Sequence, residues 1–197
     1  MIRIFDILLS ILGIIVLVPV LLLVYFVIVL ESKGGGFYLQ KRVGLNGVDF
    51  TLLKFRSMHI DSEKYGLITI GGKDSRITKT GMIIRRFKLD ELPQLFNVIK
   101  GDMSLVGPRP EVRKYVDLYT SEQLKVLKVR PGITDYASVE YASENELLGA
   151  AKNPDKVYVD QIMPDKIRLN MKYIDHQNLK EYFKVIFLTI SHIVKPN

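Results

Sequence analysis

Two adjacent carboxylates, Asp90 and Glu91, mark the stretch FKLDELPQL as a place where phosphate chemistry could occur. Neighbouring side chains on a helix diverge by about 100° around its axis, so this pair cannot hold one proton between two facing carboxylates. The pair instead suits divided roles, in which one carboxylate attacks a phosphorus atom and the other positions it or handles a proton. The simpler interpretation is structural: Asp90 caps a helix and Glu91 decorates its first turn.

Positive charge must accompany such an attack, because a phosphate diester repels an approaching anion until Mg²⁺ or arginine side chains neutralise the charge. Arg109 is the most suggestive cation, since prolines on both sides restrict its backbone and lower the entropic cost of fixing its guanidinium on a phosphate. A structural turn with an exposed arginine is the alternative. The candidate cations are Lys54, Arg56, Arg85, Arg86 and Arg109.

A β-hairpin is predicted upstream of the acidic pair. Two runs rich in β-forming residues, 37–45 and 48–55, flank Asn46-Gly47, and this pattern is typical of a type I′ turn. Lys54 and Arg56 lie near the end of the second run, where they either face the site or face solvent. The polar, glycine-containing residues from 61 to 80 predict a loop with one short strand, LITI.

A helix is predicted directly after the acidic pair. Pro93 suits its first turn and Gly101 suits its C-terminal end. Asp90 and Glu91 would then lie at the helix start, where free N–H groups and the helix dipole favour a carboxylate or a phosphate. The apolar residues at helical spacing are Leu92, Leu95, Phe96 and Ile99.

The composition limits the classes of protein to consider. With 197 residues, 48% of them hydrophobic, the chain predicts one domain with a hydrophobic core. The absence of cysteine excludes a disulfide framework, a thiolate nucleophile and cysteine-based metal sites. The net charge of +7 predicts an anionic partner, which could be nucleic acid, an anionic lipid surface or a phosphorylated substrate. Nothing groups the three histidines as metal ligands.

The residues from 7 to 30 carry no charge and exceed the ~20 residues that a helix needs to cross a bilayer. The run is longer than the apolar part of a signal peptide and lacks a cleavage site after it. Pro19 removes a backbone donor near its middle and predicts a kink. Positive residues flank both ends, which suits a helix that enters and returns. Taken alone, the segment favours a single-pass helix with a tolerated proline.

The ordered motifs resemble the bacterial sugar transferases, the small monotopic phosphoglycosyl transferases that act on a polyprenol phosphate. The resemblance covers nearly the whole chain, and a set of motifs in this order is far more specific than any one of them. The motifs are RIFD, the spacing of Gln40, Arg42, Gly44, Gly47 and Phe50, KFRSM in place of KFRTM, LDELPQLFNV, KGDMSLVGPRP and VRPGIT.

The resemblance implies a ping-pong reaction in which a UDP-sugar gives its sugar phosphate to undecaprenyl phosphate and releases UMP. Asp90 would be the nucleophile that forms a covalent phosphosugar intermediate and would hold Mg²⁺, with Glu91 as its partner. Lys54, Arg56, Arg85 and Arg109 would bind the substrates. The product would begin a capsule, O-antigen, exopolysaccharide or glycoprotein glycan.

The resemblance also implies an α+β fold in two parts. Residues 1–33 would form a re-entrant membrane helix bent at Pro19, and residues 34–197 a helix-rich catalytic domain with a β-hairpin and interfacial amphipathic helices. The active site would lie on the cytoplasmic face of the bacterial inner membrane, among membrane lipids. The run 181–194 carries apolar residues on one face and would rest on the bilayer, on the membrane helix or in the core.

Some features depart from the family pattern or stay open. Val18 precedes Pro19 where relatives often have serine, so other groups must satisfy the freed backbone of a bend. The residues from 135 to 146 differ from those of many relatives and are the suspected region of sugar selectivity, with Asp135, Tyr136 and Glu140 as candidates. Neither the sugar nor the oligomeric state can be inferred.

Two other classes of protein compete with the enzyme. One is a non-catalytic membrane anchor or assembly subunit of a polysaccharide machinery, whose acidic pair is merely a helix cap. The other is a nucleic-acid binder, suggested by the basic stretches KFRSM and IIRRFK. The long uncharged segment and the lack of a recognisable DNA- or RNA-binding motif argue against nucleic acid as a partner.

Overall fold

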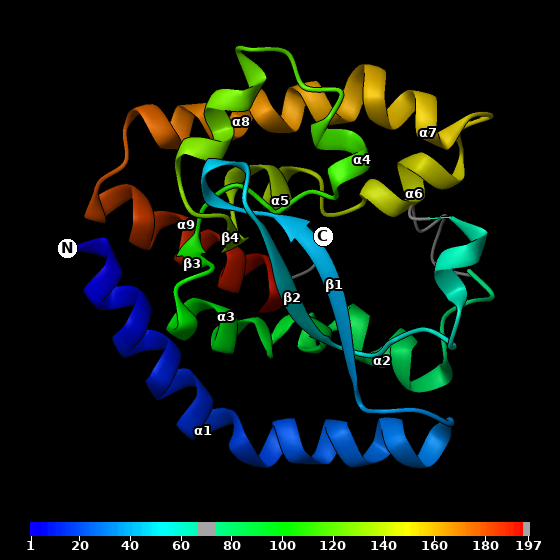
Figure 1. Cartoon of the computed structure of the whole chain (residues 1–197). Coiled ribbons are helices and arrows are strands. Elements are labelled where there is room, and N and C mark those ends of the chain that lie inside the picture. Colours follow the sequence, from blue (N-terminus) through cyan, green and yellow to red (C-terminus); the bar gives the residue numbers. More distant parts are fainter. Residues whose placement is uncertain (67–73, 195–197) are drawn as a thin grey trace.

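A long N-terminal helix, α1 (Ile2–Glu31), lies along one edge of the molecule, and α8 (Met163–Asp175) lies along the opposite edge (Figure 1). The hairpin of β1 (Phe37–Val43) and β2 (Asp49–Phe55) crosses the space between them. Helices dominate and the sheets are small, so the expected α+β class is confirmed.

The computed structural model describes residues 1–66 and 74–194. The strand expected at residues 67–70 therefore lies outside the described residues. The remaining elements, with short 3₁₀ or π turns labelled η, are η1 (Leu45–Gly47), η2 (Ser62–Tyr65), α2 (Lys79–Arg86), η3 (Leu89–Glu91), α3 (Gln94–Lys100), β3 (Ser104–Val106), α4 (Arg113–Val116), η4 (Gln123–Lys128), β4 (Gly132–Thr134), α5 (Tyr136–Glu140), α6 (Glu144–Gly149), α7 (Pro154–Val157), η5 (Tyr158–Ile162) and α9 (Leu179–Val194).

The predicted hairpin is confirmed, with β1 and β2 antiparallel and Val43 opposite Asp49. Asn46 and Gly47 both have positive φ, as a type I′ turn requires. The strands end earlier than expected, however, so the connection runs from Gly44 to Val48 and is longer than the Asn-Gly pair. The Gly44 N–H closes it by donating to the Val48 carbonyl at 2.8 Å.

A second, parallel pair of strands brings two of the motifs together. β3 lies in KGDMSLVGPRP and β4 lies in VRPGIT, with Ser104 opposite Gly132 and Val106 opposite Thr134. The backbones then approach so closely that a Cβ atom on Gly132 would lie 2.1 Å from the Gly107 nitrogen. Position 132 therefore requires glycine, and the close backbone contact fixes the path of the segment that follows β3.

The polar residues at the start of α1 bind the rest of the protein. The Asp6 side chain is 2% exposed, and its Oδ1 accepts hydrogen bonds from Ser104 Oγ, the Leu105 N–H and Tyr182 Oη, each at 2.9 Å. Arg3 donates to the carbonyls of Ile99 and Met103, both at 3.2 Å. The first turns of α1 are therefore attached to α3, β3 and α9.

The C-terminal half of α1 packs on a different part of the domain. Val24 and Ile28 form a buried cluster with Phe55 of β2 and Ile84 of α2. Two of the glycines that follow α1 lie close against other side chains. A Cβ atom on Gly34 would lie 2.2 Å from Arg56 Nη1, and one on Gly36 would lie 2.4 Å from the Tyr25 ring.

Most of the apolar surface of α1 remains uncovered. The helix is long and apolar enough to cross a membrane, and 11% of its most apolar 18-residue window is buried. Pro19 lies inside the helix, and the ribbon of α1 changes direction along its length in Figure 1. Re-entry into one leaflet stays a prediction.

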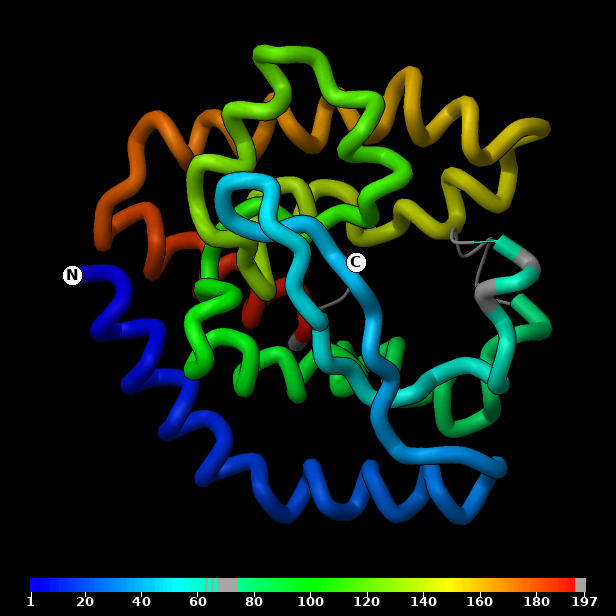
Figure 2. Tube along the Cα trace, in the orientation of Figure 1, coloured from blue at the N-terminus to red at the C-terminus, as the bar shows by residue number. Residues whose placement is uncertain are grey.

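Some apolar residues of α9 are buried or contact α1, and others are exposed at the surface. Tyr182 and Val185 are fully buried, and the Phe183 ring meets the Phe5 ring edge to face at a centroid distance of 5.3 Å. Phe187 and Ile190 are 73% and 56% exposed. Figure 2 shows the start of α9 beside the first turns of α1. Helix α9 therefore packs partly in the core and partly on α1, and contact of its exposed residues with the bilayer stays a prediction.

We predict that Asp6→Ala lowers the free energy of unfolding by about 3 kcal/mol, because it leaves the hydroxyl and N–H donors of β3 and α9 without their acceptor. Thermal unfolding in detergent measures the effect. Asp117→Ala, which removes an exposed carboxylate, is the matched control. Equal melting temperatures for the two variants would contradict the role assigned to Asp6.

Candidate active site

Asp90 and Glu91 lie in η3, a single turn between α2 and α3. The expected start of the following helix is therefore wrong by a few residues, because Pro93 is the N-cap of α3 and no side chain caps that helix. Lys88 takes the N-cap position of η3, again without a side-chain cap. The interpretation of Asp90 as a helix cap is therefore wrong, and its carboxylate is left for another use.

Glu91 forms an ion pair with Arg109. Arg109 Nη2 and Nη1 donate to Glu91 Oε1 and Oε2 at 2.5 and 3.3 Å, and the Glu91 side chain is 12% exposed. Burial alone would raise the pKa of Glu91, but Arg109 and Lys54 hold it well below its usual range. Glu91 in turn raises the pKa of Arg109. Glu91 is thus a fixed anion, both of whose oxygens are used.

Asp90 is in the opposite state. Its carboxylate makes no hydrogen bond and no ion pair with any of the residues that the structure describes. Burial and the adjacent Glu91 charge raise its pKa, although Lys54, Arg85 and Lys88 partly offset this. A more basic carboxylate with free lone pairs suits a nucleophile or a metal ligand. The two neighbours therefore have different chemistry because their surroundings differ.

Three of the predicted cations surround the acidic pair. Lys54 lies on β2, where burial and the nearby Arg109 charge lower its pKa to about 7 despite the opposing effect of Glu91 and Asp90. Arg85, at the end of α2, acts electrostatically on Asp90. Arg109 completes the group through its ion pair with Glu91. The structure thus brings Lys54, Arg85 and Arg109 together around the two carboxylates.

Arg56 does not join this group. Its side chain is 7% exposed, and its Nη2 donates to the Ser32 carbonyl at 2.9 Å and to Ser32 Oγ at 3.0 Å. Nη1 donates to the Lys33 carbonyl. The guanidinium therefore closes the C-terminal end of α1, where a positive charge also complements the helix dipole.

The backbone of Arg109 is fixed by a buried aspartate. Asp135 is 1% exposed, and its Oδ2 accepts the Arg109 N–H at 2.7 Å while its Oδ1 accepts the Ser138 N–H at the start of α5. On the same segment, the Gly132 N–H donates to the Pro108 carbonyl at 2.9 Å. Arg109 is therefore not an exposed arginine on a turn. Asp135 serves this segment and is too buried to meet a sugar directly.

A second network holds the end of the 107–110 segment. Arg42 Nη1 donates to the Pro110 carbonyl at 2.9 Å and to Glu111 Oε1 at 3.3 Å. Glu111 also accepts the Val112 N–H at 2.8 Å and the Tyr158 hydroxyl. The functional prediction did not include Arg42, Glu111 or Tyr158. Gln40 and Arg42 lie two residues apart in a strand, so their side chains share one face. This spacing was the sequence signal that could have indicated the network.

Lys88 adopts an unusual backbone conformation two residues before Asp90. Its φ of 56° and ψ of 20° lie in the left-handed region, which costs a residue other than glycine about 1 kcal/mol or more. The side chain is exposed and its charge acts on both Asp90 and Glu91. The chain therefore turns just before the acidic pair and keeps the charge of Lys88 near both carboxylates.

The residues fit Mg²⁺ as a shared rather than a caged ion. Within residues 1–66 and 74–194, no group of three or more acidic, histidine or cysteine side chains could hold a metal. Mg²⁺ is commonly bound through one or two carboxylates together with substrate phosphates and water. The Asp90 oxygens have no partner among the described residues and could serve this purpose, whereas Glu91 is occupied by Arg109.

Comparisons with known proteins agree on one family. The family described as bacterial sugar transferase matches residues 1–196. A UDP-N-acetylgalactosamine-undecaprenyl-phosphate N-acetylgalactosaminephosphotransferase of Aeromonas hydrophila is 38% identical, covering 96% of this chain and 42% of its own length. The uncharacterized sugar transferase EpsL of Bacillus subtilis is 34% identical, covering 98% and 86%. A UDP-glucose:undecaprenyl-phosphate glucose-1-phosphate transferase of Caulobacter vibrioides is 33% identical, covering 98% and 69%.

The left-handed backbone of Lys88 gives a stability prediction. At an ordinary position alanine is more stabilising than glycine, but at a left-handed position the order reverses. We expect Lys88→Gly to be more stable than Lys88→Ala by about 1 kcal/mol, as measured by thermal unfolding. The same pair of substitutions at Lys100, at the end of α3, is the control and should favour alanine. A more stable Lys88→Ala would show that the left-handed turn is absent.

The lowered pKa of Lys54 gives a pH prediction. Between about pH 7 and the unfolded-state value of 10.5, the unfolded chain keeps this proton and the folded chain loses it, so stability from this group rises with pH. Below pH 7 both states are protonated and the cost of the buried charge is constant. The stability of the wild type relative to Lys54→Met should therefore improve from pH 7 to pH 10 in thermal unfolding. A flat or falling difference would contradict the assigned pKa.

Proposed function

The chain belongs to the bacterial sugar transferase family, and from this premise we propose that it transfers a sugar 1-phosphate from a UDP-sugar to undecaprenyl phosphate and releases UMP. The observation that carries the proposal is the difference between the two acidic residues. Glu91 is held by Arg109, whereas Asp90 has a raised pKa and makes no hydrogen bond or ion pair within residues 1–66 and 74–194. The names of the Aeromonas and Caulobacter relatives, which include a UDP-sugar and undecaprenyl phosphate, support this choice of substrates.

The first half-reaction is an attack by an Asp90 carboxylate oxygen on the β-phosphorus of the UDP-sugar. The new bond joins Asp90 to the sugar phosphate, and the bond between that phosphorus and the bridging oxygen breaks. The electron pair leaves on the oxygen of UMP. The raised pKa of Asp90 makes its carboxylate a stronger nucleophile than an ordinary aspartate.

The second half-reaction returns Asp90 to its starting state. A phosphate oxygen of undecaprenyl phosphate attacks the same phosphorus, and the bond to the Asp90 oxygen breaks. The product is a sugar joined to the lipid through a diphosphate. Because the enzyme carboxylate enters and leaves the same phosphorus, UMP departs before the lipid reacts, which is a ping-pong order.

The cations around the pair have defined tasks in this scheme. Arg109 binds donor phosphates while it keeps Glu91 ionised, and Arg85 and Lys54 offset charge on the attacked phosphoryl group. Mg²⁺, when bound, would be held by Asp90 and the phosphates and would neutralise phosphate charge. Arg56 is left out of substrate binding, because its guanidinium is committed to the end of α1.

The proposal places the enzyme on a membrane, with its active site on the cytoplasmic face of the bacterial inner membrane. The exposed apolar surface of α1 supports this placement, and Met82 and Ile83 of α2, together with Phe87 directly after it, are exposed as well. In this scheme residues 1–33 bend at Pro19 and re-enter, and residues 34–197 form the catalytic domain. A lipid phosphate and a soluble nucleotide sugar can then meet at the interface.

We predict that Asp90→Asn lowers UMP release by at least about a thousandfold, because an amide oxygen is a poor nucleophile towards phosphorus. The assay supplies Mg²⁺, undecaprenyl phosphate and a panel of UDP-sugars to the purified full chain. Asp160→Asn, an exposed aspartate of η5, should keep wild-type turnover.

The same assay separates the enzyme from its main alternative. A non-catalytic anchor or assembly subunit should release no UMP with any donor. A wild type that turns over while Asp90→Asn retains its rate would instead remove Asp90 from the mechanism.

A further inference from the structure

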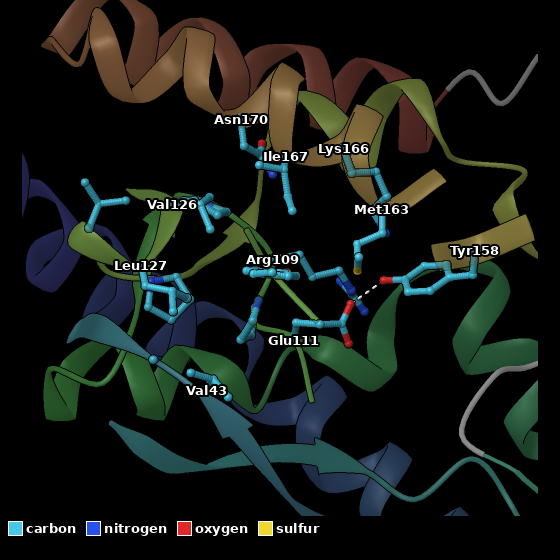
Figure 3. Close-up of a pocket in the computed structure, with 16 residues that line it drawn as sticks. Val43, Arg109, Glu111, Val126, Leu127, Tyr158, Met163, Lys166, Ile167 and Asn170 are labelled. Atoms are coloured by element: carbon cyan, nitrogen blue, oxygen red, sulfur yellow. Dashed lines mark hydrogen bonds between the residues drawn. The ribbon is translucent and has the colours of Figure 1, made fainter. Parts of the chain in front are cut away.

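A pocket lies between the 107–110 segment and α8 (Figure 3). Its walls are mostly apolar, with side chains from β1, η4 and α8. The apolar side chains from these elements include Val43, Val126, Met163 and Ile167. The polar residue Asn170 closes one end, as Figure 3 shows.

Asn170 has an acceptor with no partner. The residue is 5% exposed, and its Nδ2 donates to Asp135 Oδ2 at 3.5 Å. A carboxylate can only accept, so this contact fixes which end of the amide is nitrogen. Its Oδ1 is buried and makes no hydrogen bond within the described part of the chain. A buried acceptor of this kind calls for a ligand that brings a donor.

Most of the other polar side chains of the pocket are already occupied, whereas the Tyr119 hydroxyl, which also lines it, makes no hydrogen bond within the described residues. Both oxygens of Glu111 accept hydrogen bonds from Arg42, Val112 and Tyr158. Lys166 pairs with Glu144 at 2.7 Å. A buried free acceptor and a hydroxyl among apolar walls suit a flat heterocycle that carries one N–H beside a carbonyl. A sugar, with hydroxyl groups around its whole ring, would leave several of them unsatisfied here.

The position of the pocket connects it to the proposed reaction. Arg109 contributes to the pocket wall, and the guanidinium of the same residue holds Glu91 beside Asp90. Asp135 binds both the Arg109 N–H and the Asn170 amide. A nucleotide whose base occupied the pocket would therefore direct its phosphates along Arg109 towards the carboxylate pair.

We infer that this pocket binds the uracil ring of the donor nucleotide, with the uracil N3–H donating to Asn170 Oδ1. The inference rests on the proposed function and adds a specificity residue to it. Cytosine has an acceptor at the same ring position, so it would face Asn170 Oδ1 with two lone pairs opposed. Asn170 thereby selects uridine over cytidine nucleotides.

The test compares three nucleotides that differ at this ring position. Calorimetry with the purified full chain measures the binding of UMP, CMP and N3-methyl-UMP. We expect UMP to bind about tenfold more tightly than either of the others, because they leave Asn170 Oδ1 unsatisfied. Equal affinities for UMP and N3-methyl-UMP would overturn the inference, and would show that the Asn170 oxygen binds ordered water alone.

A variant pair assigns the effect to Asn170. Asn170→Ala should lose the preference for UMP over N3-methyl-UMP and should raise the KM for the UDP-sugar with kcat retained. Asn153→Ala, which removes an amide that caps α7 outside the pocket, should keep the preference. A preference that survives in Asn170→Ala would also overturn the inference. If Asn170→Ala does not fold, the wild-type comparison of the three nucleotides still decides.

The outcome is separable from that of the proposed function. An enzyme that releases UMP but binds UMP and N3-methyl-UMP equally refutes the role of Asn170 and leaves the reaction intact. A chain that releases no UMP but discriminates between the two nucleotides refutes the reaction and leaves the pocket assignment standing.

Discussion

The ion pair between Glu91 and Arg109 is the interaction on which the candidate site depends. Adjacent carboxylates on one turn would otherwise have similar properties. Because Arg109 occupies both oxygens of Glu91, that residue stays anionic, and its charge helps to raise the pKa of Asp90. One interaction thus creates a fixed anion and a free, more basic carboxylate from two neighbouring acidic residues.

The position of Arg109 is secured by contacts that reach across the chain. Asp135 accepts the Arg109 N–H, and Arg42 donates to the carbonyl of Pro110. The close backbone contact between Gly107 and Gly132, beside the paired strands β3 and β4, fixes the path of the segment between them. Asp6 binds β3 as well, so the attachment of α1 and the segment that carries Arg109 share one strand. Helix α1 and the candidate site are therefore parts of one connected structure.

The sequence predicts the features that local patterns encode. The hairpin and the end of α3 at Gly101 each follow from residues within a few positions of one another, and local motifs also pick out Asp90, Glu91 and Arg109 as candidates. Contacts between distant residues are not encoded locally. The contacts of Arg56 with Ser32 and of Asp135 with Arg109 could not be predicted from local patterns, because the partners lie more than twenty positions apart. The left-handed turn at Lys88 has no glycine to signal it.

The central claim is that Asp90 carries the sugar phosphate covalently. The most direct test is the intact mass of the purified protein after incubation with Mg²⁺ and UDP-sugars in the absence of lipid acceptor. The account predicts a mass increase of one sugar phosphate on the wild type, located on Asp90 by peptide mapping and absent from Asp90→Asn. An adduct that persists in Asp90→Asn, or a wild type that turns over donor with lipid yet never carries the adduct, would contradict it.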